Sequence, residues 1–368
     1  MKSALQPLHY LSSDIFEQEQ QQLFSRLWIY ACMKSAVDAD QAFATRRIGG
    51  RSILIQNCGG EIRAFENACP HRLMPIQNQL FGQARMVCPY HGWVFDNAGN
   101  VKSIPKENKL YRYCEVDRKD LRLREFKIEI IGGLVFINLD EDPLPINEQF
   151  SDQLLTHLKS ISSYFGDLSV NANIPVKYNW KLNFENVLDH QHIPYVHPKS
   201  FQPLVRQVAP VENEEQEMYP DPSDLLIDQS WASTTKMYIK PWPWHALVKP
   251  YGGENTYHNY FIFPNVNFIS VGGLIYLVQQ FEPVSANETL VRFDLCTARP
   301  TARIPALPAI LRGHLKGEVE VLMEDVEFLE RLQSSLHLDS MAVNHGQYEH
   351  RLVGFGLAYL RLLQGRKP

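Results

Sequence analysis

Two short loops that each pair a cysteine with a histidine constrain this chain more than any other feature. Cys69 and His71 form a Cys-x-His pair, and Cys88 and His91 form a Cys-x-x-His pair after an intervening stretch of sixteen residues. A proline directly follows each cysteine and stiffens the loop. Each loop can therefore project one thiolate and one imidazole toward a common metal, and the surrounding chain has to fold around that centre.

Two thiolates on one iron and two imidazoles on the other are the ligands of a Rieske [2Fe–2S] centre. Neutral imidazoles leave such a cluster less negative than four thiolates do, which raises its reduction potential. We expect Tyr90 and Trp93 either to shield or hydrogen-bond the cluster or only to pack there. A Cys2His2 zinc site uses the same ligand types, but the Cys-x-His spacing suits a tetrahedral site poorly.

Composition excludes several classes of protein. The 368 residues carry 36 basic and 41 acidic side chains, a formal net charge of −5, so the chain offers no basic stripe to nucleic acid. It has no run of about 18 apolar residues that would span a membrane, and its first residues lack the apolar core of a signal peptide. Six cysteines are too few and too scattered for a disulfide framework. We therefore expect a cytoplasmic protein.

The pattern of turns and apolar residues divides the chain into three parts. Residues 1–38 are expected to form an N-terminal helical segment, opened near Ser13, that packs on the C-terminal domain. Residues 39–145 show short β-like runs separated by glycines, typical of a small antiparallel β domain. Residues 146–368 mix strands and helices around one antiparallel sheet, with a loop over 209–228. The predicted fold class is α+β: a small all-β domain and a larger α+β domain whose antiparallel sheet is flanked by helices.

A second group of potential metal ligands lies in the C-terminal part. Residues 179–192 read as a helix that ends before Pro194. One face of this helix, within about 60°, carries Glu185, Asp189 and His192. His197 follows His192 by five residues and can reach back to the same metal from beyond the proline. Two imidazoles and one carboxylate form the facial triad that binds Fe(II) with open positions for O2 and substrate.

The carboxylate of such a triad has to come from elsewhere, and a helix expected over about 318–336 supplies a candidate. Asp325 falls in the middle of an apolar face formed by Val321, Leu322, Val326, Phe328, Leu329 and Leu332. The opposite, solvated face carries Glu320, Glu324, Glu327 and Arg331. An unpaired buried carboxylate costs several kcal/mol, so Asp325 needs a cation. On this pattern alone, a metal and a buried Arg or Lys partner are equally suitable.

The two groups of ligands together resemble the motifs of one known family. Cys-Pro-His, sixteen residues and Cys-Pro-Tyr-His-Gly-Trp are similar to the cluster motif of Rieske non-haem iron oxygenases, the α subunits of aromatic-ring-hydroxylating dioxygenases and N-demethylating monooxygenases. N-W-K-x3-E-N-x2-D-x2-H-x4-H over 179–197 is similar to their catalytic-iron motif. E-D-V-E-F-L-E-R-L-Q, which contains Asp325, resembles the segment with their third iron ligand.

This resemblance implies the roles of the residues. A Rieske [2Fe–2S] cluster is implied on Cys69, His71, Cys88 and His91. A mononuclear Fe(II) is implied on His192, His197 and Asp325. Asp189 takes the position of the bridging acid, which in the family links an iron-ligating histidine to a cluster histidine of the neighbouring subunit. The resemblance therefore also implies a head-to-tail homotrimer, in which electrons pass between subunits.

The resemblance implies a terminal oxygenase component that uses O2 to hydroxylate, dihydroxylate or demethylate a small organic substrate. The chain has no dinucleotide or flavin fingerprint, so NAD(P)H supplies electrons only indirectly, through a separate ferredoxin or flavin reductase. The E-N-x2-D spacing over 185–189 resembles the smaller homotrimeric enzymes more than the ring dioxygenases, which favours monooxygenation or demethylation.

Two other functions stay open on the sequence. The first is a Rieske electron-transfer protein without an oxygenase site, and the second is a zinc-stabilised interaction module. Substrate identity is equally open. The tryptophans at 231, 242 and 244 are expected to pack in a sheet, with a cage for a quaternary amine as the alternative.

Overall fold

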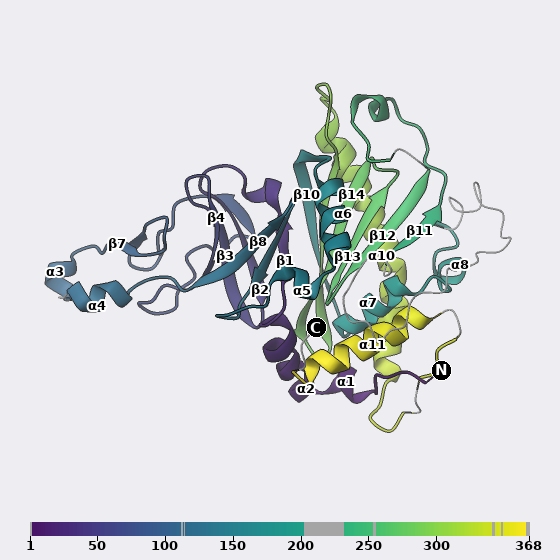
Figure 1. Ribbon diagram of the computed structural model, residues 1–368, viewed down its shortest axis with the longest axis horizontal. Helices are drawn as coiled ribbons and strands as arrows, with labels where there is room; N and C mark the ends of the chain where they lie inside the picture. The colour runs from purple at the N-terminus through teal and green to yellow at the C-terminus, as the bar shows by residue number, and fades with distance from the viewer. Residues whose placement is uncertain are drawn as a thin grey trace. The chain divides into compact units, whose positions relative to one another are not determined.

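The computed structural model describes residues 2–111, 113, 115–201, 232–252, 255–340, 343–346 and 349–365. They form two compact units. The smaller unit is Phe24–Leu144, and the larger combines Met1–Leu23 with Pro145–Pro368. The first is built on β-strands and the second on a sheet with helices (Figure 1). The predicted α+β class, with a small β domain and a larger α+β domain, is confirmed.

The smaller unit contains a seven-stranded antiparallel sheet in the order β1-β9-β8-β4-β3-β2-β5. Its strands are β1 Ile29–Met33, β2 Ala42–Ile48, β3 Arg51–Asn57, β4 Ile62–Glu66, β5 Phe81–Gln83, β8 Glu125–Ile131 and β9 Leu134–Asn138. A two-stranded sheet joins β6 Val94–Phe95 and β7 Val101–Ser103. The short helices are η2 Lys34–Val37, α3 Glu107–Leu110 and α4 Glu115–Asp120. The hairpins β3–β4 and β8–β9 turn at Gly59-Gly60 and Gly132-Gly133, within the region where short β-like runs separated by glycines were expected.

The smaller unit begins earlier than the expected limit at residue 39. Its strand β1 pairs with β9, with Ile29 opposite Ile137 and Met33 opposite Leu134. All five residues of β1 are buried. Helix α2 (Ser13–Glu19) therefore does not continue toward residue 38, and a π-helical turn, η1 (Gln20–Phe24), leads the chain into the sheet. Pairing and burial of an apolar segment decide this boundary, since both outweigh local helical periodicity.

The larger unit contains a six-stranded antiparallel sheet in the order β10-β15-β14-β13-β12-β11. Its strands are β10 Phe165–Val176, β11 Ser233–Lys236, β12 Thr256–Ile262, β13 Val266–Val271, β14 Ile275–Ser285 and β15 Glu288–Ala298. Gly272 and Gly273 open the three-residue connection between β13 and β14, and their φ of 57° and 64° are left-handed values that glycine adopts readily. A Cβ on Gly273 would lie 1.9 Å from the backbone oxygen of Tyr251, so only glycine fits there.

Helices cover both faces of this sheet. They are α1 Leu8–Leu11, α2, α5 Ile146–Gln149, α6 Asp152–Ser162, α7 Trp180–Leu188, α8 Ile193–Val196, η4 Pro243–Leu247, α10 Leu307–Ser335 and α11 His350–Leu363. On one face His157 of α6 packs on Tyr260 of β12. On the opposite face Phe184 of α7 packs on Phe281 of β14. The long helix α10 contacts β10 and β15.

The N-terminal helices lie beside α11, so the two ends of the larger unit meet (Figure 1). A buried ion pair joins them to α7. Nζ of Lys181 donates a hydrogen bond to Oε1 of Glu19 at 2.5 Å, and neither side chain has any exposed surface. The hydroxyl of Tyr359, on α11, donates to the same oxygen at 2.6 Å, and Nε1 of Trp180 donates to Oε2 at 2.9 Å.

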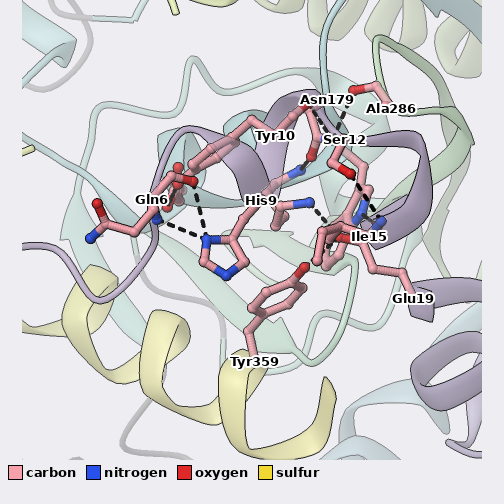
Figure 2. Close-up of polar contacts among 12 residues, drawn as sticks. Gln6, His9, Tyr10, Ser12, Ile15, Glu19, Asn179, Ala286 and Tyr359 are labelled. Carbon is pink, nitrogen blue, oxygen red and sulfur yellow. Dashed lines mark hydrogen bonds and ion pairs between the residues drawn. The ribbon is translucent and has the colours of Figure 1, made fainter. Parts of the chain in front are cut away.

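Two further contacts hold α7 in place. The side chain of Asn179 caps the helix by accepting a hydrogen bond from the backbone N–H of Lys181 at 3.1 Å. Its amide donates to the carbonyl oxygens of Tyr10 and Ala286 (Figure 2). The hydroxyl of Tyr10 also donates to Oε1 of Glu185 at 2.7 Å. Helix α7 is therefore held at its N-terminus by Asn179 and near its centre by Glu185. These contacts fix the position from which residues 189–197 continue.

Candidate metal centres

The two Cys-His loops of the smaller unit have the same backbone construction. In the first, the N–H of Cys69 donates to the carbonyl of Met74 and the N–H of Leu73 to that of Cys69, both at 2.8 Å. In the second, Cys88 donates to Trp93 at 2.8 Å and Gly92 to Cys88 at 3.0 Å. The fifth residue of each loop, Leu73 or Gly92, has a positive φ of 58° or 72°. Two equivalent turns thus present two equivalent pairs of side chains.

The predicted cluster residues come together at the tips of these loops. Cys69 and Cys88 are both buried, and burial together with the neighbouring thiol of Cys88 raises the pKa of the Cys69 thiol to about 11. The rings of His71 and His91 lie 4.6 Å apart. Nδ1 of each ring is buried and, among the described residues, has no hydrogen-bond partner. Two adjacent thiols and two unsatisfied imidazole nitrogens fit the donor set of a Rieske cluster.

The aromatic residues of the second loop differ in their surroundings. Trp93 is fully buried and its ring stacks on His71, with centroids 5.0 Å apart and an interplanar angle of 3°. Tyr90 is 55% exposed, and its ring centroid lies 4.0 Å from that of His91. Trp93 therefore packs against the cluster loops on the side that faces the domain core. Tyr90 lies beside His91 on the surface, where solvent or a partner protein can contact it.

In the larger unit, helix α7 is shorter than predicted. It ends at Leu188, and Asp189 is extended, with φ of −90° and ψ of 125°. The carboxylate of Asp189 accepts a hydrogen bond from the backbone N–H of Gln191 at 2.7 Å, an Asx turn that competes with the helix. Asp189 and His192 thus do not share a helical face as predicted. The chain re-enters a short helix, α8, with Pro194 in its first turn.

The turn nevertheless brings the three predicted iron ligands together. Nε2 of His197 lies 3.0 Å from Oδ1 of Asp325, and Nε2 of His192 lies 3.7 Å from the same oxygen. One ligand atom from each residue lies within 4.8 Å of the others. Ligand atoms at about 2.1 Å from one metal and at right angles stand about 3.0 Å apart. The spacing of these three side chains therefore suits a single ion.

The environment of Asp325 supports a metal over the alternative partner. Oδ1 of Asp325 is buried and accepts no hydrogen bond from the described residues. No Lys or Arg in the described part of the chain forms an ion pair with it, because its charged contacts are the two imidazoles. A buried carboxylate oxygen without a donor is costly. Two histidines and one carboxylate fit a facial triad with open coordination positions.

Asp189 lies beside this triad. Its Oδ2 is 3.4 Å from Nδ1 of His192, the ring nitrogen that faces away from Asp325. The side chain of Asp189 keeps 21% of its surface exposed, so it contacts an imidazole of the triad on one side and is accessible on the other. Desolvation alone would raise the pKa of its carboxyl, but the adjacent His192 ring and the hydrogen bond from Gln191 outweigh it and lower that pKa. Asp189 is thus charged at neutral pH.

The buried face of α10 differs from the predicted one. Leu322, Asp325, Val326, Leu329 and Gln333 are buried. Phe328 and Leu332, which were expected in the apolar face, are each 46% exposed. A helix of 3.6 residues per turn buries only a stripe, and this stripe is centred on the line from Leu322 to Leu329.

Glu324 is a site residue that sequence reasoning missed, because it was assigned to the solvated face. Its Oε2 lies 2.8 Å from Nδ1 of His197 and accepts a hydrogen bond from the hydroxyl of Ser200 at 2.6 Å. A carboxylate at the second nitrogen of a metal-binding imidazole orients the ring. The sequence signal for this role was the adjacent acidic pair Glu324-Asp325. Two consecutive carboxylates on one helix can contact the two ring nitrogens of one histidine.

The remaining sequence predictions concern the tryptophans and the loop over 209–228. Trp231 and this loop lie outside the described residues. Trp244 is buried, whereas Trp242 is exposed and has Nζ of Lys240 at 4.6 Å over its ring. Within the described chain, no helix is long and apolar enough to cross a membrane.

Two protein families match this chain. The Rieske [2Fe-2S] domain matches residues 27–120, and the ring hydroxylating alpha subunit (catalytic domain) matches residues 163–365. The first match begins close to the structural boundary at Phe24 and includes both Cys-His loops. The second covers more than half of the chain and includes the triad.

Individual relatives agree with these matches. The anthranilate 1,2-dioxygenase large subunit of Acinetobacter baylyi is 30% identical over 196 residues, 51% of this chain and 41% of that protein. The carnitine monooxygenase oxygenase subunit of Acinetobacter pittii is 26% identical over 302 residues, 78% of this chain and 73% of that protein. The chain thus spans less than half of the first relative and nearly three quarters of the second.

A solved structure shows the same fold. It is a quaternary ammonium Rieske monooxygenase in complex with L-carnitine, which aligns with a TM-score of 0.73 at 20% identity and covers 98% of this chain and 94% of that one. At this level of identity the similarity concerns the fold. The coverage shows that both units have counterparts in one solved protein.

Proposed function

The chain belongs to the family of ring-hydroxylating alpha subunits that carry a Rieske [2Fe-2S] domain, and on this premise we propose that it is the terminal oxygenase component of a Rieske oxygenase system. The observation that carries the proposal is the convergence of His192, His197 and Asp325 on one point. A Rieske electron-transfer protein needs only the cluster ligands and does not require this second set of metal ligands. A zinc-stabilised interaction module does not require two separate sets of metal ligands.

The proposed roles of the residues follow from their chemistry. Cys69, His71, Cys88 and His91 hold the Rieske cluster. His192, His197 and Asp325 hold the mononuclear Fe(II). When bound, the cluster supplies single electrons and the mononuclear iron supplies activation of O2. The protein places His192 and His197 at the two ends of α8 and Asp325 on α10, a donor set that would leave coordination positions open for O2 and substrate, and it keeps Asp189 charged beside His192.

The proposed assembly is a head-to-tail homotrimer. Around the cluster loops, Leu73, Met74 and Tyr90 are exposed apolar side chains. Near the triad, Tyr195, Met323, Phe328 and Leu332 are exposed as well. Aromatic residues and Met are enriched at protein interfaces, and two different patches on one chain pair head-to-tail and close into a ring. In the related quaternary ammonium Rieske monooxygenase, electrons pass between subunits.

The proposed reaction is the oxidation of a small organic substrate with O2, with NAD(P)H electrons arriving through a ferredoxin or flavin reductase. The relatives include a dioxygenase for anthranilate and a monooxygenase for carnitine. The spacing Glu185-Asn186-x2-Asp189 favours monooxygenation or demethylation for this chain. We place the protein in the cytoplasm, where its buried free thiols stay reduced.

Metal analysis tests this proposal directly. The purified protein is expected to contain about three irons and two acid-labile sulfides per chain, two irons in the cluster and one in the triad. Asp325→Ala should lower the iron content to about two per chain and keep the Rieske absorption spectrum. Glu327→Ala, an exposed acid half a turn further along α10, is the matched control. A wild-type protein with about two irons per chain would support the electron-transfer function, and one without iron would support the zinc module.

A further inference from the structure

A surface excursion of the smaller unit reaches one of the predicted cluster ligands. It connects β7 to β8 and contains the short helices α3 and α4. These helices lie next to each other (Figure 1), joined by an ion pair between Arg118 and Glu107 at 3.4 Å. Near the return to the sheet, the N–H of Leu123 donates a hydrogen bond to the carbonyl of Gly99 at 2.9 Å. The excursion is therefore tied to the unit at its base and braced within itself.

Two tyrosines connect the excursion to the core. No residue of α3 is buried, and Leu110 at its end is 66% exposed. Tyr111 and Tyr113 follow this helix, are both half-buried, and pack against the apolar core that contains Cys69 and Cys88. Their rings stack on each other, with centroids 5.7 Å apart and an interplanar angle of 15°. In this part of the excursion, contact with the core therefore comes from the tyrosine pair and not from the helix.

Tyr111 contacts the imidazole of His71. The two ring centroids lie 5.4 Å apart with an interplanar angle of 87°, an edge-to-face arrangement. Tyr111 also meets Trp93 edge-to-face, at 5.6 Å and 86°, while Trp93 stacks on His71. The imidazole of His71 is thus in contact with two large aromatic rings that stand perpendicular to each other, and both its position and its surroundings are fixed.

The second imidazole has different surroundings. His91 contacts Tyr90, which is itself more than half exposed. Within the described residues, no ring contact joins His91 to the tyrosines of the excursion. The excursion therefore covers one imidazole of the predicted cluster site and not the other.

Such a cover affects the energy of reduction. A [2Fe–2S] centre accepts one electron and becomes more negative by one charge, and nearby water stabilises that charge. Apolar rings beside a metal centre exclude water and lower the local dielectric, and they thereby shift its reduction potential. Tyr111 lies at the boundary, with one side on His71 and Trp93 and the other toward solvent. Its ring is therefore placed to keep water away from His71.

We propose that Tyr111 is a positioning residue of the Rieske centre, which covers His71 and holds the reduction potential of the cluster low. Tyr113 supports it by stacking on its ring. The inference rests on the proposed function through one assignment, that of His71 as a cluster ligand. A lower potential makes the reduced cluster a stronger one-electron donor to the mononuclear iron, so the excursion would favour onward transfer of the electron.

A redox titration tests the proposal. The cluster-loaded protein is titrated with dithionite in the presence of mediators, and the electron paramagnetic resonance signal of the reduced cluster is followed. Tyr111→Ala is expected to raise the equilibrium constant for reduction at least about threefold, an upward shift of about 28 mV at about 59 mV per tenfold change. Tyr111→Phe keeps the ring and should have the potential of wild type. Leu110→Ala, an exposed change at the adjacent position, is the matched control and should also keep it.

A tyrosine that only packs would change the stability of the protein and leave the potential where it was. An unchanged or lowered potential in Tyr111→Ala would therefore overturn the proposal. So would a shift of the same size in Leu110→Ala, or in Tyr111→Phe, which would assign the effect to the hydroxyl. If Tyr111→Ala does not retain its cluster, Tyr111→Leu fills part of the same space and has to shift the potential upward as well.

The titration is separable from the test of the oxygenase function, because it needs the cluster and not the mononuclear iron. A protein with about two irons per chain would count against the oxygenase and still give the potentials of all variants. A protein with about three irons whose potential does not respond to Tyr111→Ala would count against the role of Tyr111 alone. A wild type without a cluster would overturn both proposals.

Discussion

Oε2 of Glu324 lies 2.8 Å from Nδ1 of His197, while Nε2 of the same ring lies 3.0 Å from Oδ1 of its sequence neighbour Asp325. Two consecutive residues of α10 thus contact opposite edges of one imidazole. Ser200 donates a hydrogen bond to Glu324 and holds its carboxylate in place. A carboxylate at Nδ1 favours the tautomer that leaves Nε2 free to bind a metal.

Removal of this carboxylate should weaken the mononuclear site. We expect Glu324→Ala to lower the affinity for Fe(II) by about 10- to 100-fold, because the ring of His197 loses its orientation. Titration of the apo-triad with Fe(II) or Co(II), with the Rieske cluster intact, measures this change. Glu327→Ala removes an exposed acid of the same helix and should have no effect. An unchanged affinity in Glu324→Ala would mean that packing alone orients His197.

Asp189 is expected to act in electron transfer without being needed for metal binding. Asp189→Asn keeps an oxygen that can accept the hydrogen bond from Gln191, so the turn after α7 should persist. The variant should retain about three irons per chain and slow single-turnover oxidation of the cluster by at least about tenfold. Rapid-mixing absorption spectroscopy follows the cluster directly. A rate equal to that of wild type would remove Asp189 from the bridging role.

The buried pair of Glu19 and Lys181 should behave as a unit. Glu19→Ala leaves Lys181 as an uncompensated buried charge and is expected to destabilise the larger unit by about 3–5 kcal/mol. Glu19→Leu combined with Lys181→Met should cost much less, because no buried charge remains. Denaturant unfolding of both variants and of the exposed control Glu17→Ala gives the comparison. Equal destabilisation by the single and double changes would contradict an ion pair of this kind.

Glu318 should make stability depend on pH. Desolvation raises the pKa of its carboxyl from 4.5 to about 7, so the folded state binds this proton more tightly than the unfolded state does. Wild type should therefore lose stability relative to Glu318→Gln as the pH rises from about 4.5 to about 7, by up to about 3 kcal/mol, with no further loss above that range. Unfolding of both proteins at several pH values measures the difference. A difference that stays constant with pH would show that Glu318 is hydrated.

Local patterns predicted much of both centres. The Cys-His loops are short and closed by their own backbone hydrogen bonds, so spacing alone places Cys69 beside His71 and Cys88 beside His91. Asp325 could be recognised because a charge in an apolar helical stripe needs a partner. The hairpins and the α+β class followed from alternation and glycine turns, since these signals act between residues close in the chain.

Long-range packing decided the rest. The sequence pattern could not show that β1 belongs to the smaller unit, because its partner β9 lies about a hundred residues away. The end of α7 at Leu188 depended on the Asx turn of Asp189, which outweighs helical periodicity.

The sequence by itself determined which residues can bind metal and in which two groups they lie, because ligand chemistry and spacing are properties of short segments. Only the tertiary structure decided which neighbours those residues have. It turned Glu324 toward His197 and joined Glu19 to Lys181 across 162 residues. The physical reason is that burial and electrostatic pairing depend on the surfaces that pack together in space, and a linear pattern does not contain that information.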